Sequence, residues 1–179
     1  MNIQIVEPKK EDAYVMIDVR YKAWLVTYPN KKAGITADDI EQRYKDAFSE
    51  EKIKKMEDLI TDHSPDEKMF LAKDGEMVVG VCFGVIEEDK NKLEAMYVLP
   101  EHHNQGIGTK LWNKLLPFFE NNKDIYVEVA DYNNRAISFY KKLGFVDTGR
   151  RFSDERFRMK SGGIITEMEM VIKSKENQS

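Results

Sequence analysis

Three strand-like segments follow one another in the middle of the chain, and they constrain the fold more than any other feature. The first two are the apolar runs within KMFLAKDGEMVVGVCFGVIEE, residues 68–88. Asp74 and Gly75 separate them, and an Asp-Gly pair between apolar runs is a strong signal for a tight β-hairpin. The third segment, NKLEAMYVLP, ends at Pro100, which cannot donate a hydrogen bond to a sheet. We therefore expect antiparallel strands at the centre of the fold.

Helical segments and further strands surround this centre. Residues 12–27 are too long for one strand, and residues 36–60 begin with Thr36 as an N-cap and Asp39 three residues later. Two more helices are expected over residues 108–122, shortened or kinked by Pro117, and over residues 133–144, which end at Gly144. The remaining strands are expected at residues 3–6, 124–130, 145–150 and 164–172.

This pattern predicts the element order β-α-α-β-β-β-α-β-α-β-β. It corresponds to an α/β fold of the α+β kind, in which a mixed, mostly antiparallel central sheet carries helices on both faces. It does not correspond to a doubly wound parallel chain. No repeat, low-complexity tract or Gly/Ser linker divides the sequence, so we expect a single domain over residues 1–179.

Charge and cysteine content narrow the class of protein. The formal net charge of −4 argues against a general nucleic-acid binder. Cys82 is the only cysteine, so no intrachain disulfide is possible and a cytoplasmic setting is favoured. The first residues lack the apolar core of a signal peptide, and no apolar run approaches the roughly 20 residues that span a bilayer. We expect a cytoplasmic enzyme or binding module that contacts no membrane.

The stretch PEHHNQGIGTKLW, residues 100–112, lies between a strand and an amphipathic helix. Gly106 and Gly108 leave backbone N–H groups open at the start of that helix, with the positive end of the helix dipole behind them. This arrangement suits a phosphate or diphosphate, although a glycine-rich N-cap without a ligand has the same sequence.

Other uses of this loop fit less well. A Walker loop requires Lys and then Ser or Thr after its last glycine, whereas Thr109 precedes Lys110 here. A dinucleotide fingerprint requires a third glycine, and position 111 is leucine. The adjacent His102 and His103 have no Cys or HxxxH partner nearby, so we predict solvated loop histidines and no metal site.

Two motifs between Leu93 and Phe145 carry a resemblance. LEAMYVLPEHHNQGIGTKL is followed by IYVEVADYNNRAISFYKKLGF. In this order and at this spacing they resemble the GNAT superfamily of acetyl-CoA-dependent N-acetyltransferases. The family pattern in the loop is Gln/Arg-x-x-Gly-x-Gly/Ala, and His103 stands where the family has Gln or Arg. The resemblance implies a GNAT-like fold and acetyl-CoA as cosubstrate.

The resemblance also implies which residues hold the cofactor. The backbone of Met96 and Val98, on a strand that splays from the next one, is expected to pair with the pantetheine arm, although core packing also explains both residues. Asn133 is expected to bind the arm beyond the second strand. The implied diphosphate cradle consists of Asn104, Gln105, Gly106, Ile107, Gly108 and Thr109. Because backbone N–H groups hold the diphosphate, the exchange at His103 affects one side-chain contact and not the choice of cofactor.

Tyr140 matches the family tyrosine near the thioester sulfur, where a phenol can act as general acid toward the departing thiolate. The alternative is a half-buried helix tyrosine beside Phe139. An attacking amine must lose a proton, and Glu128 resembles the glutamate that accepts it in several family members. Glu94 is the second candidate, on the face expected to carry Met96 and Val98. Either carboxylate can instead be a rim group that binds a cationic acceptor.

The acceptor side is less readable. Trp24 and Tyr28, one turn apart, can line a pocket and face an amine through cation–π contact, or pack in the core. The segment GRRFSDERFRMKSGG, residues 149–163, carries four arginines that can hold an acidic acceptor or a cofactor phosphate. A solvated hairpin loop is the interpretation we favour for it.

We therefore predict an N-acetyltransferase that moves the acetyl group of acetyl-CoA to a primary amine by direct attack. The acceptor classes left open are a small amine, a polyamine, an amino acid and a peptide N-terminus. The alternative is a catalytically silent acetyl-CoA-binding regulatory or interaction module. Family members often pair through their late strands, so a homodimer is possible.

Overall fold

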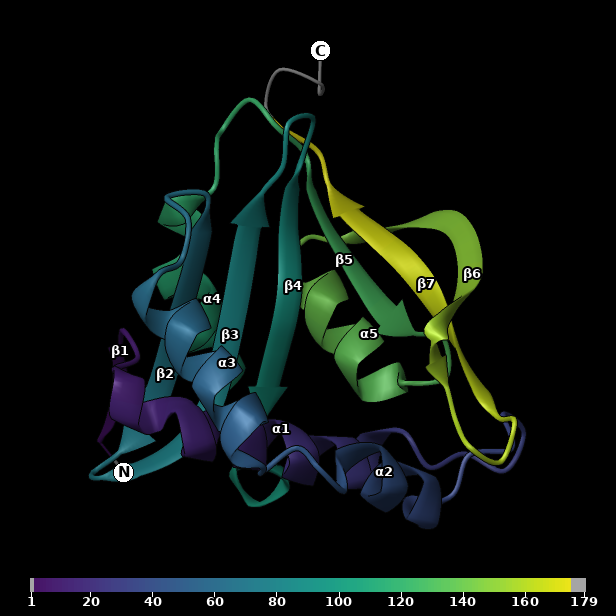
Figure 1. Ribbon diagram of the computed structural model, residues 1–179. Helices are drawn as coiled ribbons and strands as arrows, with labels where there is room; N and C mark the ends of the chain where they lie inside the picture. The colour runs from purple at the N-terminus through teal and green to yellow at the C-terminus, as the bar shows by residue number, and fades with distance from the viewer. Residues whose placement is uncertain (1, 175–179) are drawn as a thin grey trace.

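A computed structural model describes residues 2–174 and shows one seven-stranded sheet with helices packed on it (Figure 1). The strands lie in the order β1-β2-β3-β4-β5-β7-β6, and every neighbouring pair is antiparallel except β4 and β5. This confirms the predicted mixed, mostly antiparallel sheet, and the seven strands follow one another along the chain as predicted. The strands are β1 (Ile3–Val6), β2 (Glu67–Asp74), β3 (Met77–Ile86), β4 (Asn91–Val98), β5 (Ile125–Ala130), β6 (Val146–Arg158) and β7 (Ile164–Ile172).

Helices cover both faces of this sheet. They are α1 (Ala13–Thr27), α2 (Ala37–Tyr44), α3 (Glu50–Thr61), α4 (Ile107–Leu115) and α5 (Asn134–Lys142). Successive strand residues point to opposite faces of a sheet, so the neighbours of two adjacent β4 residues show which helix covers which face. The hydroxyl of Tyr97 accepts a hydrogen bond from Trp24 of α1, whereas Val98 pairs with Gly80, above which Leu111 of α4 lies. Helices α1 and α4 therefore lie on opposite faces.

The segment predicted as one helix over residues 36–60 is two helices. Thr36 caps α2 as expected, because its hydroxyl accepts from the Asp39 backbone and the Asp39 carboxylate accepts from the Thr36 backbone. The chain then leaves the helix after Tyr44, and Phe48 in the connection packs against Tyr14 of α1 with 5.0 Å between ring centroids. This contact with α1 accounts for a break that the apolar spacing did not reveal.

Two other boundaries bear on the site. Pro117 lies in a 3-10 turn, Leu116–Phe118, that follows α4, so the proline shortens this helix as predicted. The charged segment predicted as a loop over residues 149–163 is mostly strand, because β6 continues to Arg158 and only residues 159–163 turn. Two register shifts within β6 let this polar strand continue beside β7.

Strands β4 and β5 are paired only at their start. Asn91, Lys92 and Leu93 pair with residues 125–127, and beyond these positions the two strands diverge (Figure 1). The fully buried Asn91 fixes this point. Its side chain donates to the carbonyl oxygens of Glu120 (2.8 Å) and Lys123 (3.0 Å) and accepts from the Glu120 backbone (3.1 Å). The divergence opens the sheet toward α5 and the start of α4.

Candidate active site

The loop between β4 and α4 forms an open helix start. Gly106 is the N-cap of α4 with φ +75°, and Asn104 also adopts a positive φ of +62°. The first hydrogen bond inside the helix runs from the Lys110 N–H to the Gly106 carbonyl. The N–H groups of Ile107, Gly108 and Thr109 therefore have no acceptor within the helix and point toward the loop. They form a site for an anion, strengthened by the helix dipole.

Gly106 and Gly108 serve different purposes. A Cβ on Gly106 would meet nothing within 4 Å, so this residue is a glycine because of its left-handed backbone. A Cβ on Gly108 would lie 3.0 Å from the ring of Phe139, so this residue is a glycine because α5 approaches closely. Gly108 thus sets the distance between α4 and α5, a role that the sequence pattern did not show.

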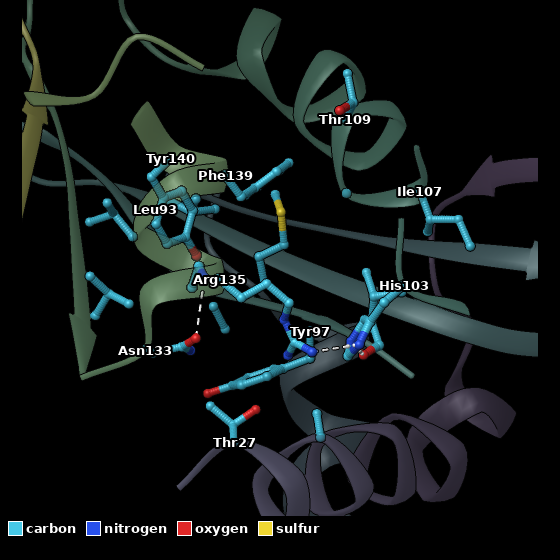
Figure 2. Close-up of a pocket in the computed structure, with 18 of the residues that line it drawn as sticks. Thr27, Leu93, Tyr97, His103, Ile107, Thr109, Asn133, Arg135, Phe139 and Tyr140 are labelled. Atoms are coloured by element: carbon cyan, nitrogen blue, oxygen red, sulfur yellow. Dashed lines mark hydrogen bonds between the residues drawn. The ribbon is translucent and has the colours of Figure 1, made fainter. Parts of the chain in front are cut away.

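The two histidines are not solvated, contrary to the sequence prediction. His103 Nε2 donates to the Val98 carbonyl (2.9 Å), and its Nδ1 accepts from Arg135 of α5 (2.6 Å; Figure 2). Desolvation, and then the charge of Arg135, lower the pKa of His103, so the ring is neutral and joins the loop to α5. His102 is 9% exposed, lines the cavity described below, and has no hydrogen-bond partner at Nδ1 among the described residues.

The exposed edge of β4 lies beside this loop. The Leu99 N–H donates to the Val79 carbonyl of β3. Because every second residue of an antiparallel strand bonds to the same neighbour, the backbone N–H and C=O groups of Met96 and Val98 face away from β3. The Val98 carbonyl is taken by His103. The remaining backbone groups of Met96 and Val98 face the divergence from β5, where an extended ligand can pair with them.

A cavity of about 510 Å³ fills the divergence between β4 and β5 (Figure 2). Sites for small molecules have volumes of roughly 300–1,000 Å³. Figure 2 shows Tyr140 and Asn133 at one side, Ile107 and Thr109 at another, and Tyr97 and Thr27 toward α1. The cavity brings together almost all residues predicted from the sequence, namely Met96, Val98, Asn104, Gly106, Ile107, Gly108, Thr109, Asn133, Tyr140, Glu94, Glu128 and Tyr28.

Two predicted residues lie outside this lining. Gln105 points to the backbone of Glu101, to which its amide donates (3.2 Å). Trp24 is 1% exposed and lies behind the wall, where its ring is 4.2 Å from that of Tyr28 and its Nε1 donates to the Tyr97 hydroxyl (3.1 Å). Tyr97, which the sequence reading passed over, therefore lines the cavity with its hydroxyl fixed by Trp24.

Tyr140 is 6% exposed and packs edge-on against Phe145, with 5.6 Å between centroids. Its hydroxyl has no hydrogen-bond partner among the described residues. Burial, and then the neighbouring Tyr97, raise the pKa of Tyr140 well above its ordinary value. The phenol is therefore protonated throughout the usual pH range and free to donate into the cavity.

Both predicted carboxylates are held by one lysine. Lys92 Nζ lies 3.0 Å from Glu94 Oε2 and 3.0 Å from Glu128 Oε2. A bulge separates the register positions of Leu93 and Ala95, and Glu94 is the extra residue. Glu94 is therefore on the face of Lys92 and not, as alternation predicted, on that of Met96 and Val98.

Glu167 is a carboxylate that the sequence reading missed. It pairs with Ala130 across β5 and β7, on the sheet face that carries Glu128. Desolvation, and then the charge of Glu128, raise the pKa of Glu167 to about 7. The alternating glutamates of ITEMEMV were its only sequence signal.

The four arginines of β6 are all paired with carboxylates. The N···O distances are 2.8 Å for Arg150–Glu169, 2.7 Å for Arg151–Asp147, 2.5 Å for Arg156–Asp154 and 2.6 Å for Arg158–Glu155. Their charges are thus balanced within the strand region.

Asn133 caps α5. Its Oδ1 accepts from the Ala136 N–H (3.2 Å), while its amide nitrogen remains open to the cavity.

A strand that splays from its parallel neighbour, an open helix start and an unpartnered tyrosine between them define the class of acyl-CoA-dependent acetyltransferase folds. The family model described as "Acetyltransferase (GNAT) family" matches residues 37–145, more than half of the chain. The chain belongs to this family.

Individual relatives agree with this membership. The chain is 30% identical over 101 residues to a peptidyl-lysine N-acetyltransferase, YjaB, of Salmonella typhimurium, covering 56% of this chain and 65% of the relative. It is 39% identical over 57 residues to the thialysine N-epsilon-acetyltransferase of Mus musculus, covering 31% and 34%. The chain thus spans less than two thirds of these curated relatives.

Among solved structures, the PaiA N-acetyltransferase from Thermoplasma acidophilum in complex with coenzyme A matches with a TM-score of 0.70 at 24% identity. The match covers 94% of this chain and 98% of that one, so the two share a fold. No helix between residues 2 and 174 is long and apolar enough to cross a membrane. The same residues contain no cluster of three or more His, Cys, Asp or Glu side chains arranged to hold a metal ion.

Proposed function

We propose that the protein is an N-acetyltransferase that transfers the acetyl group of acetyl-CoA to a primary amine. The observation that carries this proposal is Tyr140, whose ring is buried and whose protonated hydroxyl has no partner among the described residues, at the wall of the cavity beside an open helix start. A phenol held in this way can donate to a ligand in the cavity.

The residues present fit acetyl-CoA. The N–H groups of Ile107, Gly108 and Thr109 can hold its diphosphate, and the edge of β4 at Met96 and Val98 can pair with its pantetheine arm.

When bound, acetyl-CoA supplies an acetyl group activated as a thioester. Glu128 is our candidate to accept a proton from the amine, which must be neutral to attack, and Lys92 holds this carboxylate in place. Tyr140 donates a hydrogen bond, and then its proton, toward the sulfur as the carbon–sulfur bond breaks. After the transfer Glu128 holds one extra proton and Tyr140 lacks one. Exchange with solvent returns both groups to their starting protonation states, so the protons balance.

Cysteine chemistry has no part in this proposal. Cys82 is 1% exposed, and burial raises the pKa of its thiol to about 12, so no thiolate forms near neutral pH. We place the reaction in the cytoplasm, which the absence of any second cysteine for a disulfide supports.

The acceptor class rests on coarser support. The named relatives act on peptidyl-lysine and thialysine, as their names state, and in both of these the acceptor is an amine. A panel of amines, polyamines, amino acids and peptides, assayed for thiol release from acetyl-CoA with mass spectrometry of the product, tests the proposal. Turnover with at least one amine is expected. CoA binding without any turnover would instead identify a silent acetyl-CoA-binding module.

The same assay tests the base. Glu128→Gln should lower kcat by about 100-fold, since general acid–base groups contribute typically 10²–10⁴-fold. Glu94→Gln, which loses a partner of the same Lys92, is the matched control and should retain most activity. A wild-type pH–rate profile in Glu128→Gln would remove Glu128 from the mechanism.

A further inference from the structure

Two arginines beside Trp24, behind the α1 wall of the cavity, lack the carboxylate partners that the arginines of β6 have. Arg20 on α1 and Arg43 on α2 form no ion pair with any residue between 2 and 174. Both residues are exposed as a whole, although their guanidinium groups are partly desolvated. Arg43 Nη1 donates to the Arg156 carbonyl (2.9 Å), and its other donors have no acceptor among the described residues.

Arg20 adjoins the cavity through the geometry of α1. Ala23 and Thr27 line the cavity, and Arg20 precedes them by three and seven residues, the spacing of one helix face. Arg20 therefore lies one turn beyond Ala23, about 10 Å along the helix from Thr27 at a rise of 1.5 Å per residue. Arg20 itself does not line the cavity, but it hydrogen-bonds to Tyr97, which does.

Both guanidinium groups rest on one indole. Arg20 Cζ lies 5.6 Å and Arg43 Cζ 5.1 Å from the centre of the Trp24 ring, and Arg43 Cζ is also 5.3 Å from that of Phe157. Partial desolvation lowers the pKa of Arg43, and the charge of Arg20 adds to this. Desolvation of Arg20 is outweighed by Tyr97 and Tyr44, which raise its pKa. Two like charges placed together without a counterion repel each other, so the arrangement favours a bound anion.

The sheet wall of the cleft, opposite α1, carries an excess of negative charge. Glu94 and Glu128 share the single charge of Lys92, and Glu167 lies on the same face as Glu128. A cleft with carboxylates on its sheet wall and unpaired guanidinium groups on its helix wall matches a ligand that carries both an amine and an anion.

We propose that Arg20 and Arg43 form a subsite for a carboxylate of the acceptor. The inference rests on the proposed acetyl transfer to an amine. It narrows the acceptor to an amino-acid-like molecule whose amine reaches Glu128 and Tyr140 while its carboxylate binds the two guanidinium groups that stack on Trp24. Planar guanidinium groups bind the two oxygens of a carboxylate in parallel, which suits this assignment.

Acceptors that differ only in the carboxylate test the subsite by kinetics. In the wild type, L-lysine should be acetylated with a higher kcat/KM than cadaverine or L-lysinamide. Arg20→Met and Arg43→Met should each lower kcat/KM for lysine by about 10- to 100-fold, the worth of a charge-assisted hydrogen bond. Cadaverine should change by less than about threefold in both variants. Arg151→Met, an exposed arginine paired within β6, is the control and should behave as wild type.

A lysine-terminated peptide with a free or an amidated C-terminus distinguishes the sources of the carboxylate. A higher kcat/KM for the peptide with a free C-terminus than for free lysine assigns the subsite to peptides. A higher kcat/KM for free lysine assigns it to amino acids. Equal use of lysine and cadaverine by the wild type, or an equal loss of both in the arginine variants, would overturn the proposal while leaving acetyl transfer intact.

Binding without turnover separates the two proposals. 6-Hydroxyhexanoate, which has the carboxylate but no amine, should change the fluorescence of Trp24 saturably. Measuring in the Trp112→Phe variant assigns the signal to Trp24, because the chain has no other tryptophan. Arg20→Met should abolish this change. No response in the wild-type protein, whose folding is not at issue, would sink the subsite even where acetyl transfer is established. A response without any acetyl transfer would sink the proposed function and support the subsite.

Discussion

At the scale of single residues, Tyr140 combines two properties that rarely occur together in a core side chain. Its ring is packed between Phe139 and Phe145, with centroid distances of 5.4 and 5.6 Å, yet its hydroxyl is left without a partner among the described residues. The aromatic contacts fix the ring, so the hydroxyl occupies one position relative to the cradle of α4. This is the preorganisation that a proton donor needs.

Tyr140→Phe keeps those aromatic contacts and removes only the donor. We expect kcat to fall by about 100-fold or more, because general acids contribute typically 10²–10⁴-fold. The dissociation constant of CoA, measured by calorimetry, should stay near the wild-type value. Since the raised pKa keeps the phenol protonated, the wild-type rate should show no alkaline decline from Tyr140 at pH 9. Unchanged kcat in Tyr140→Phe would assign the residue to packing alone.

Glu167 gives a prediction on stability against pH. Desolvation raises its folded pKa to about 7, above the ordinary value of 4.5. Between these two pH values the folded chain retains a proton that the unfolded chain releases, so this group's contribution to stability is full below pH 4.5 and is lost as the pH rises through 7.

Glu167→Gln removes this dependence. The melting temperature of the variant minus that of the wild type should therefore increase from pH 4.5 to 7 and level off above about pH 8. Glu169→Gln, two residues away on the same strand, is the comparison for removing a carboxylate from this strand. A difference that stays constant with pH would show that Glu167 titrates normally.

At the scale of elements, the contact between α4 and α5 distinguishes the two glycines of the loop. Gly106→Ala forces an alanine into a left-handed conformation, at a cost of roughly 1–2 kcal/mol, and should weaken CoA binding through the distorted cradle. Gly108→Ala places a methyl 3.0 Å from Phe139, so it should mainly lower the free energy of unfolding, by about 1–3 kcal/mol.

Phe139→Leu in the Gly108→Ala background provides room for the methyl and should recover part of that loss, which urea unfolding measures. No rescue is expected for Gly106→Ala, because nothing contacts its Cβ position. If Phe139→Leu rescued both variants equally, the separation of roles would be wrong.

The elements also show how much the sequence could predict. The presence of each strand and the sequence of strands along the chain followed from apolar runs, turn signals and Pro100, since these are local. The break near Phe48 and the extension of β6 depend on contacts with α1 and β7, which local spacing does not encode. In the site, motif positions named Tyr140 and, apart from Gln105, the loop residues that line the cavity. Lys92, Tyr97, Glu167 and the unpaired Arg20 and Arg43 were missed because their importance arises only when distant segments meet.

At the scale of the whole molecule, the sheet consists of β1–β4 and β5–β7 joined by three residue pairs at the start of β4 and β5. Beyond that junction, where the strands diverge, two contacts connect the parts. The Phe139 ring packs on Gly108, and Arg135 donates a hydrogen bond to His103. A ligand in the cavity contacts both parts at once. Its binding should therefore stabilise the whole fold in one cooperative transition and not one half alone.

CoA at 100 times its dissociation constant stabilises a folded protein by about 2.7 kcal/mol. For a chain of this size that corresponds to a rise in melting temperature of roughly 5–11 °C, measurable by calorimetric scanning. Tyr140→Phe should show the full rise, since it leaves the cradle intact, whereas Gly106→Ala should show a smaller one. Inorganic phosphate at equal ionic strength is the control for a nonspecific anion effect. A rise with CoA that phosphate reproduces in full, or separate transitions for the two parts of the sheet, would contradict a ligand that bridges β4 and β5.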